Sequence, residues 1–130
     1  MATYLLDTSV IIDVLNDKRG RRDLLLGIVR EGHLLACCPI NVTEIYAGLR
    51  PKEEDATEEF LSSLEYYHLT WPVARLAGML KRDHRRRGQT LTLADITIAA
   101  VALVHELTLM TDNVKDFPMK DLRLYPLPQG

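Results

Sequence analysis

Acidic side chains recur along this chain of 130 residues at the points where apolar runs begin or end. Asp7, for example, directly follows the apolar run Tyr4–Leu6. A carboxylate without partners is costly to bury, so such an acid either makes local backbone hydrogen bonds or binds a cation. The acids that share this setting are Asp7, Glu44, Asp95, Asp112 and Asp116.

The local interpretation explains several of these acids without any catalysis. Asn41–Glu44 and Thr92–Asp95 both fit the capping-box pattern, in which an acid follows a capping residue by three positions. Asp7, which precedes two hydroxyl side chains, fits local turn hydrogen bonds. The pair Asp112-Asn113 fits turn chemistry. Capping uses only part of a carboxylate, so a capping acid can also be a ligand.

The elements that would position these acids alternate between strands and helices. Predicted helices occupy residues 10–17, 23–32, 41–49, 53–66, 73–88 and 93–107 by apolar spacing and stop signals. Alternation of this kind predicts an α/β three-layer sandwich with a mostly parallel sheet. The five predicted strands are Tyr4–Leu6, Leu34–Cys37, Tyr67–Thr70, Thr108–Met110 and Leu122–Tyr125.

A parallel sheet gathers ligand-binding groups outside the carboxyl ends of its strands. The acids would then meet there, and like charges that close raise one another's pKa. A cation among them would stabilise the ionised forms. Oxygen ligands, with no cysteine or histidine converging on them, favour Mg²⁺ or Mn²⁺ over zinc.

Composition restricts the partners. The net charge is −2, with 16 basic and 18 acidic residues, so any nucleic-acid footprint must be local. Basic stretches occur in "DKRGRR", residues 17–22, and in "KRDHRRRG", residues 81–88, where the alternative is a solvated helix end. The RNA-binding candidates in the second stretch are Arg82, Arg85, Arg86 and Arg87.

The remaining composition indicates a cytoplasmic protein without a membrane partner. The adjacent Cys37 and Cys38 resemble small buried hydrophobes and form no disulfide framework. No apolar run is long enough to span a bilayer. Trp71 is predicted to pack rather than to stack on bases.

Four stretches in order resemble the PIN domain, specifically the VapC-type toxins of toxin–antitoxin systems: "YLLDTSVIIDVL", "NVTEIYAGL", "LADITIAAVALVHELTLMTDNVKDF" and "LRLYPL". The resemblance covers nearly the whole chain, so residues 1–130 are expected to form a single PIN domain. It implies a PIN-like α/β/α fold and a magnesium-dependent endoribonuclease. It also implies an RNA substrate, a cognate antitoxin and a homodimer.

Carried over residue by residue, the resemblance implies catalytic roles for Asp7, Glu44 and Asp95. A fourth family Asp corresponds to Asn113 here, so Asp116 is the first choice for the remaining carboxylate and Asp112 the runner-up.

Asp7 and Asp95 would bind the principal metal ion, with Glu44, Asp116 and, less firmly, Asp112 around it. Metal-activated water would hydrolyse the phosphodiester, leaving a 5′-phosphate. The side chains expected to orient ligands or water are Thr8, Ser9, Thr111 and Asn113.

Two other functions fit the same residues. One is a PIN-fold nuclease for RNA processing or DNA cleavage, and the other is a catalytically silent binding module. The apolar helical segments 11–15 and 96–104 are explained by a homodimer contact, by a groove for an antitoxin segment, or by core burial.

Overall fold

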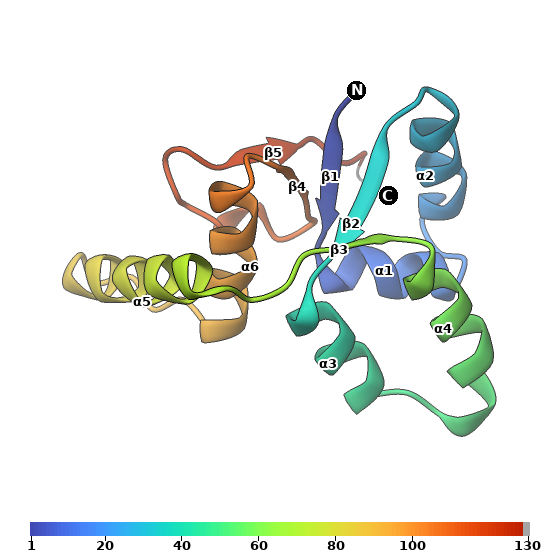
Figure 1. The fold of residues 1–130 in the computed structure, drawn as a ribbon, viewed down its shortest axis with the longest axis horizontal. Coiled ribbons are helices and arrows are strands. Elements are labelled where there is room, and N and C mark those ends of the chain that lie inside the picture. The colour runs from blue at the N-terminus through green and yellow to red at the C-terminus, as the bar shows by residue number, and fades with distance from the viewer. Residues whose placement is uncertain (129–130) are drawn as a thin grey trace.

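In a computed structural model, the described residues 1–128 form one five-stranded sheet with helices on both faces (Figure 1). All strands are parallel, in the order β3-β2-β1-β4-β5. The strands are β1 (Thr3–Leu6), β2 (Leu34–Cys37), β3 (Glu65–Tyr66), β4 (Thr108–Met110) and β5 (Arg123–Tyr125). The helices are α1 (Thr8–Leu15), α2 (Arg21–Arg30), α3 (Pro39–Ala47), α4 (Glu54–Ser62), α5 (Trp71–Arg86) and α6 (Leu93–Val104), with 3-10 turns at Pro51–Glu53 and Val114–Asp116. This is the predicted α/β/α sandwich.

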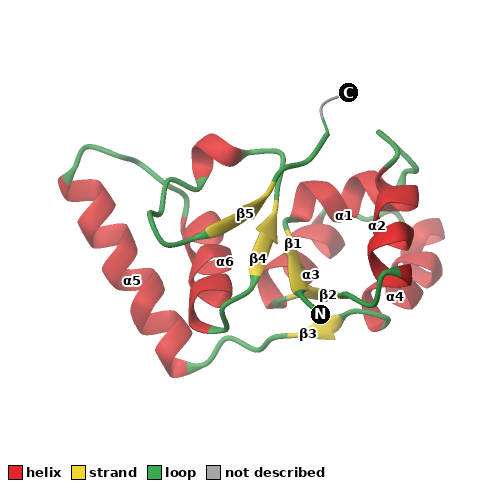
Figure 2. Ribbon diagram, turned by 90° about the horizontal axis from the view of Figure 1, so that it is seen from above, coloured by secondary structure: helices red, strands yellow, loops and turns green. Residues whose placement is uncertain are grey.

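The central strands are buried on both faces because their successive side chains point in opposite directions. Leu5 of β1 joins the core beneath α5 and α6, whereas Leu6 joins the core beneath α1, α2 and α4. Leu109 and Met110 of β4 divide in the same way. Figure 2 shows α5 and α6 on one side of the strands and α1, α2 and α4 on the other. Parallel sheets require this double cover.

The third predicted strand, Tyr67–Thr70, is wrong. The pairing is confined to Glu65–Tyr66 and ends where the Tyr67 amide donates to the Cys37 carbonyl. Thr70 is instead the N-cap of α5, with Pro72 in the first turn, where its missing N–H is tolerated. The apolar pattern located the strand wrongly because both residues of β3 are exposed to solvent at the edge of the sheet, so no burial pattern marks its position.

The predicted cap at Asn41 is also wrong. Helix α3 begins two residues earlier, at Pro39, with Cys38 as its N-cap. Asn41 stands inside the first turn, where its Oδ1 accepts a hydrogen bond of 2.9 Å from the Cys38 amide. The carboxylate of Glu44 therefore caps nothing. By contrast, Thr92 does cap α6, because its Oγ1 accepts a hydrogen bond of 3.1 Å from the Asp95 amide.

Core burial accounts for most of the apolar surface of α6. Ile96 and the run Ile98–Ala102 are almost completely buried in the centre of one core. Cys37 and Cys38 are buried too, as predicted, and burial raises the pKa of the Cys37 thiol to about 11. Among the described residues, no helix combines the length and apolarity that crossing a bilayer requires.

Candidate metal centre

The order of the strands reverses between β1 and β4. From β1 the chain proceeds to β2 and β3 on one side and then to β4 and β5 on the other. Ligands in open α/β sheets bind at such a reversal of strand order. Asp7 follows β1 directly and Thr111 follows β4 directly, so both stand at this point.

The carboxylate of Asp7 is buried and fixed on both oxygens. Only 4% of the residue is exposed. Oδ2 accepts a hydrogen bond of 2.7 Å from Thr111 Oγ1, and Oδ1 accepts one of 2.9 Å from the Thr8 amide, which makes Asp7 the N-cap of α1. These bonds leave lone pairs on both oxygens for a further ligand.

A second chain of hydrogen bonds connects α1 to Glu44. The hydroxyl of Thr8 donates to Glu44 Oε1 at 2.7 Å and accepts from Asn41 Nδ2 at 3.0 Å. Asn41 is completely buried, and its other amide atom is bonded to Cys38. Asn41 was not among the predicted site residues. Its position on the same helix face as Glu44, three residues apart, is the signal that would have found it.

The acids influence one another electrostatically. Burial raises the pKa of Asp7, the hydrogen bonds from Thr111 and Thr8 lower it, and the charges of Asp95 and Glu44 raise it further. A shift of this kind requires charges that lie close together. Glu44 is therefore near Asp7 although it arrives from a different strand end.

Asp95, in the first turn of α6, connects the remaining acid to this group. Burial raises the pKa of Asp95, the Thr92 cap opposes that effect, and the charges of Asp116 and Glu44 raise the pKa again. Thus the four carboxylates of Asp7, Glu44, Asp95 and Asp116 share one electrostatic field. We call these four residues the acidic ring.

Asp112 lies in a different environment. Its Oδ1 accepts a hydrogen bond of 2.6 Å from Arg21 Nη2, and its Oδ2 is 3.2 Å from Arg19 Nη1. Both oxygens are thus engaged by arginines, and neither Asp7 nor Asp95 shows an influence of its charge. Arg21 itself is 1% exposed, so this part of the basic stretch 17–22 is not a surface for nucleic acid.

Two other predicted site residues, Asn113 and Ser9, differ in their hydrogen bonding. The Asn113 amide donates to Thr111 Oγ1 at 3.0 Å, whereas the Asn113 side chain is exposed. Ser9 Oγ is buried and, among the described residues, has no hydrogen-bond partner. An orphaned hydroxyl two residues after Asp7 is an observation that fits an additional polar ligand near this site.

The donor set of the acidic ring fits a hard, hydrated cation. Within residues 1–128, no three acidic, histidine or cysteine side chains lie close enough to enclose an ion directly as they stand. The ring consists only of carboxylate oxygens. Mg²⁺ keeps several of its waters and is commonly held by one or two carboxylates, so a wide ring of this kind suits it.

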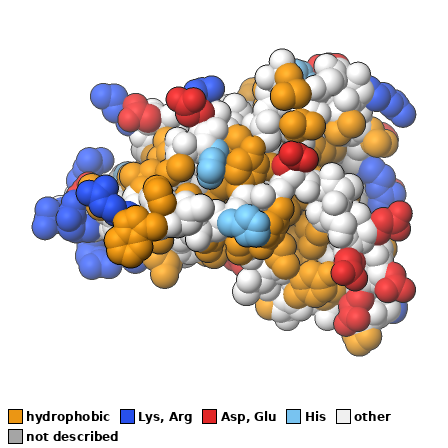
Figure 3. Space-filling model, viewed as in Figure 1, with side chains coloured by type: hydrophobic (Ala, Val, Ile, Leu, Met, Phe, Trp, Pro, Cys, Tyr) orange, Lys and Arg blue, Asp and Glu red, His pale blue; other side chains and the backbone are white. Residues whose placement is uncertain are grey.

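Most basic residues of α5 lie at its far end, although Arg75 lies near its start. Figure 3 shows Lys and Arg side chains gathered there. Arg82 is 3.2 Å from its neighbour Asp83, whereas Arg85, Arg86 and Arg87 are exposed. The loop that joins this end to α6 is held by a hydrogen bond of 2.6 Å from Lys81 Nζ to the Leu91 carbonyl.

A parallel sheet with acidic side chains near the carboxyl ends of its central strands defines an α/β domain with an acidic candidate site. Comparison with known sequences specifies the class: the PIN domain family matches residues 4–119, and the chain belongs to this family.

Its relatives include proteins named ribonuclease VapC. Ribonuclease VapC19 of Mycobacterium tuberculosis is 33% identical over 115 residues, covering 88% of this chain and 92% of the relative. Ribonuclease VapC10 of the same organism is 35% identical over 115 residues, covering 88% and 86%.

Solved structures share the fold. VapBC2 of Rickettsia felis, bound to a DNA fragment from its promoter, has a TM-score of 0.84 at 22% identity, with 95% of this chain and 97% of that chain covered. A toxin–antitoxin complex from Klebsiella pneumoniae has a TM-score of 0.76 at 26% identity, with 91% and 92% covered.

Proposed function

We propose that this chain is a single-domain, Mg²⁺-dependent endoribonuclease of the cytoplasm and the toxin of a toxin–antitoxin pair. The observation that carries the proposal is the acidic ring at the strand-order reversal, where burial and the neighbouring carboxylates raise the pKa of Asp7 and Asp95. Such a group gains most from a divalent cation when it is ionised. The relatives named ribonuclease VapC support RNA as the substrate.

Asp7 and Asp95 would hold the ion, and Glu44 and Asp116 would hold its waters. When bound, Mg²⁺ supplies a water of lowered pKa and neutralises charge on the scissile phosphate. Thr111 orients the Asp7 carboxylate by its hydrogen bond of 2.7 Å. Thr8 does the same for Glu44. Groups that orient ligands in this way commonly matter nearly as much as the ligands.

The exposed arginines at the end of α5 would bind the RNA backbone. Arg85, Arg86 and Arg87 stand a few residues before Asp95, and the Lys81–Leu91 hydrogen bond holds the connecting loop to α5. Phosphates repelled by the acidic ring require such positive charge nearby. Contacts to the backbone alone would give little sequence preference.

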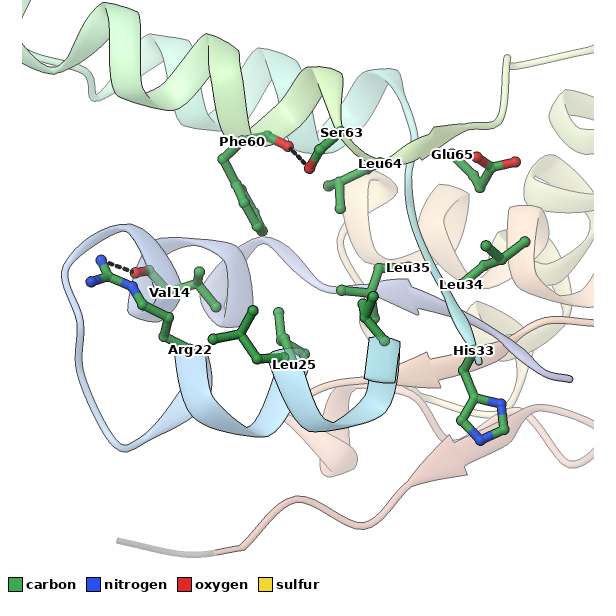
Figure 4. A pocket seen from close by; sticks show the side chains of 12 residues that line it. Val14, Arg22, Leu25, His33, Leu34, Leu35, Phe60, Ser63, Leu64 and Glu65 are labelled. Carbon is green, nitrogen blue, oxygen red and sulfur yellow. Dashed lines mark hydrogen bonds between the residues drawn. The ribbon is translucent and has the colours of Figure 1, made fainter. Parts of the chain in front are cut away.

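An apolar groove between α2 and α4 would receive the antitoxin. Its cavity of about 480 Å³ is lined by apolar side chains that include Leu25, Leu35 and Phe60, with Arg22 and Glu65 at its rim (Figure 4). Leu26 and Val29, on α2, are 46% and 49% exposed. Grooves of this kind accept the apolar face of an amphipathic helix. The toxin–antitoxin complex among the structural neighbours supports an antitoxin as the partner.

A second apolar area is the candidate homodimer contact. Trp71, predicted to pack, is 81% exposed at the start of α5, and Leu93 is 62% exposed at the start of α6. A hollow of about 440 Å³, lined by residues such as Val73 and Leu93, lies between these helices. Exposed apolar side chains next to an apolar hollow suit a contact with a second copy of the chain.

One experiment tests the enzymatic part. Purified protein is incubated with structured RNA in Mg²⁺ and then with EDTA, and equivalent DNA is run in parallel. We expect RNA cleavage that EDTA abolishes, with 5′-phosphate ends. Binding of RNA without cleavage would favour the silent binding module, and cleavage of DNA would favour the alternative nuclease. Growth arrest on expression, relieved by a co-expressed partner, tests the toxin role separately.

A further inference from the structure

The guanidinium of Arg21 contacts three segments that are far apart in the sequence, at Asp13, Asp112 and Pro128. Nη2 donates to Asp112 Oδ1 at 2.6 Å, and Nη1 donates to the Pro128 carbonyl at 3.0 Å. Nε lies 3.8 Å from Asp13 Oδ2 and has no hydrogen-bond partner among the described residues. Arg21 is 1% exposed, and a charge this deeply buried requires a partner. Asp112 is the partner at the shortest distance.

Asp112 is held from a second side by Arg19. The distance from Arg19 Nη1 to Asp112 Oδ2 is 3.2 Å. The backbone of Arg19 has a φ of 57°, in the left-handed region that residues other than glycine seldom occupy. The loop before α2 thus has an unfavourable backbone conformation at the residue whose side chain contacts Asp112.

The same turn carries the hydroxyl that contacts Asp7. Thr111 precedes Asp112 directly; its Oγ1 donates to Asp7 Oδ2 at 2.7 Å and accepts from the Asn113 amide at 3.0 Å. The Arg21–Asp112 ion pair and the Thr111 hydroxyl belong to adjacent residues of the chain. An ion pair that fixes Asp112 therefore also restricts the orientation of the Thr111 side chain. We propose that Arg21 is a positioning residue, which holds the 111–113 turn so that the Thr111 hydroxyl remains directed at Asp7.

The first test needs neither metal nor RNA, so it does not depend on the proposed function. NMR measures hydrogen exchange of the Asn113 amide, which reports the turn directly. In Arg21→Met this exchange should accelerate by roughly tenfold, while the Leu109 amide of β4 keeps its protection. The matched control is Arg22→Met, since Arg22 bonds to the Val14 carbonyl at 3.1 Å and not to the turn. The control should leave the Asn113 amide unchanged.

A conservative variant resolves the case in which Arg21→Met fails to fold. Arg21→Lys retains the charge but not the fork that reaches both Asp112 and Pro128. The Arg21→Lys protein should fold, and its Asn113 amide should exchange at a rate between those of wild type and Arg21→Met. Full protection of that amide in either folded variant would overturn the proposal.

The second test is a double-mutant cycle on Mn²⁺ affinity, and this part rests on the proposed metal site. Arg21→Met and Thr111→Val should each weaken Mn²⁺ binding roughly tenfold. If Arg21 acts through Thr111, adding Arg21→Met to Thr111→Val should cost less than about threefold more. A double variant whose loss of Mn²⁺ affinity equals the product of the two single losses would contradict the proposal. Tight Mn²⁺ binding by a wild type that leaves RNA intact would defeat only the proposed function.

Discussion

Thr111 donates a hydrogen bond of 2.7 Å to Asp7 across 104 positions of sequence. Both residues follow parallel neighbouring strands, Leu6 of β1 being in register with Met110 of β4. The bond therefore arises from strand pairing, and it gives Asp7 the only side-chain donor that it has among the described residues. Several consequences of this arrangement can be measured.

Thr111→Val removes the hydroxyl at nearly constant volume. The Asp7 carboxylate then loses one of its two hydrogen bonds, so the pKa of Asp7 rises further and its orientation is less restricted. We expect metal affinity to fall by roughly tenfold. Thr111→Ser, which keeps the donor, is the matched control and should remain near wild type. Calorimetric Mn²⁺ titration measures both, and equal affinities would contradict the assignment.

Asp7→Asn removes the most deeply buried charge of the acidic ring. RNA cleavage should fall by more than about 100-fold, since a ligand matters more than the groups that orient it. Without metal, however, the variant should unfold at a higher temperature than wild type, because burial and the charges of Asp95 and Glu44 destabilise the ionised carboxylate. Calorimetry without metal measures this, and normal cleavage by the variant would refute the site.

Metal should stabilise the protein more at neutral pH than in acid. The folded-state pKa values of Asp7 and Asp95 are raised above 3.8, so the folded state binds more protons in that window. Stability without metal therefore decreases as pH rises from 3.8 through the raised values. Mg²⁺ binds the deprotonated form, and at 100 times its Kd would contribute about 2.7 kcal/mol at neutral pH. Melting temperatures with and without Mg²⁺ across pH measure the difference; an unchanged gap would contradict this coupling.

Asp116→Asn should act on Asp95. Removing the charge of Asp116 lowers the pKa of Asp95, because that charge is among the causes that raise it. NMR titration of the Asp95 carboxyl measures the change, and metal affinity should weaken in the same variant. Asp121→Asn, an exposed acid of the following loop, is the control and should leave the titration of Asp95 unaltered.

Arg85→Ala should reduce the salt dependence of RNA binding. Each phosphate contact of a single strand contributes roughly −0.7 to the slope of log affinity against log salt, so the slope should become shallower by about that amount. Arg75→Ala, at an exposed position earlier in α5, is the matched control. Binding curves at several salt concentrations measure both slopes, and identical slopes would exclude Arg85 from the RNA path.

The strands whose bounds were predicted correctly are the ones buried in the core. Leu34–Cys37 and Thr108–Met110 were predicted with their observed bounds, since both are buried on two faces and read as continuous apolar runs. The strand predicted at Tyr67–Thr70 failed because an exposed edge strand needs only two ladder pairs. The Asn41 cap failed because Pro39 allows the helix to begin earlier.

For the candidate site, the sequence by itself determined that Asp7 follows a strand and that Asp95 lies in the first turn of a helix, since a polar residue that interrupts an apolar run lies where the run leaves the core. It also determined the cap at Thr92, a bond within four residues. Only the tertiary structure shows the different surroundings of Asp112 and Asp116, which the local sequence does not distinguish. Asp112 meets Arg21 across 91 positions, whereas Asp116 adds its charge to Asp95. Contacts between distant segments depend on how the strands are ordered and paired, and a local sequence pattern does not specify which distant segments meet.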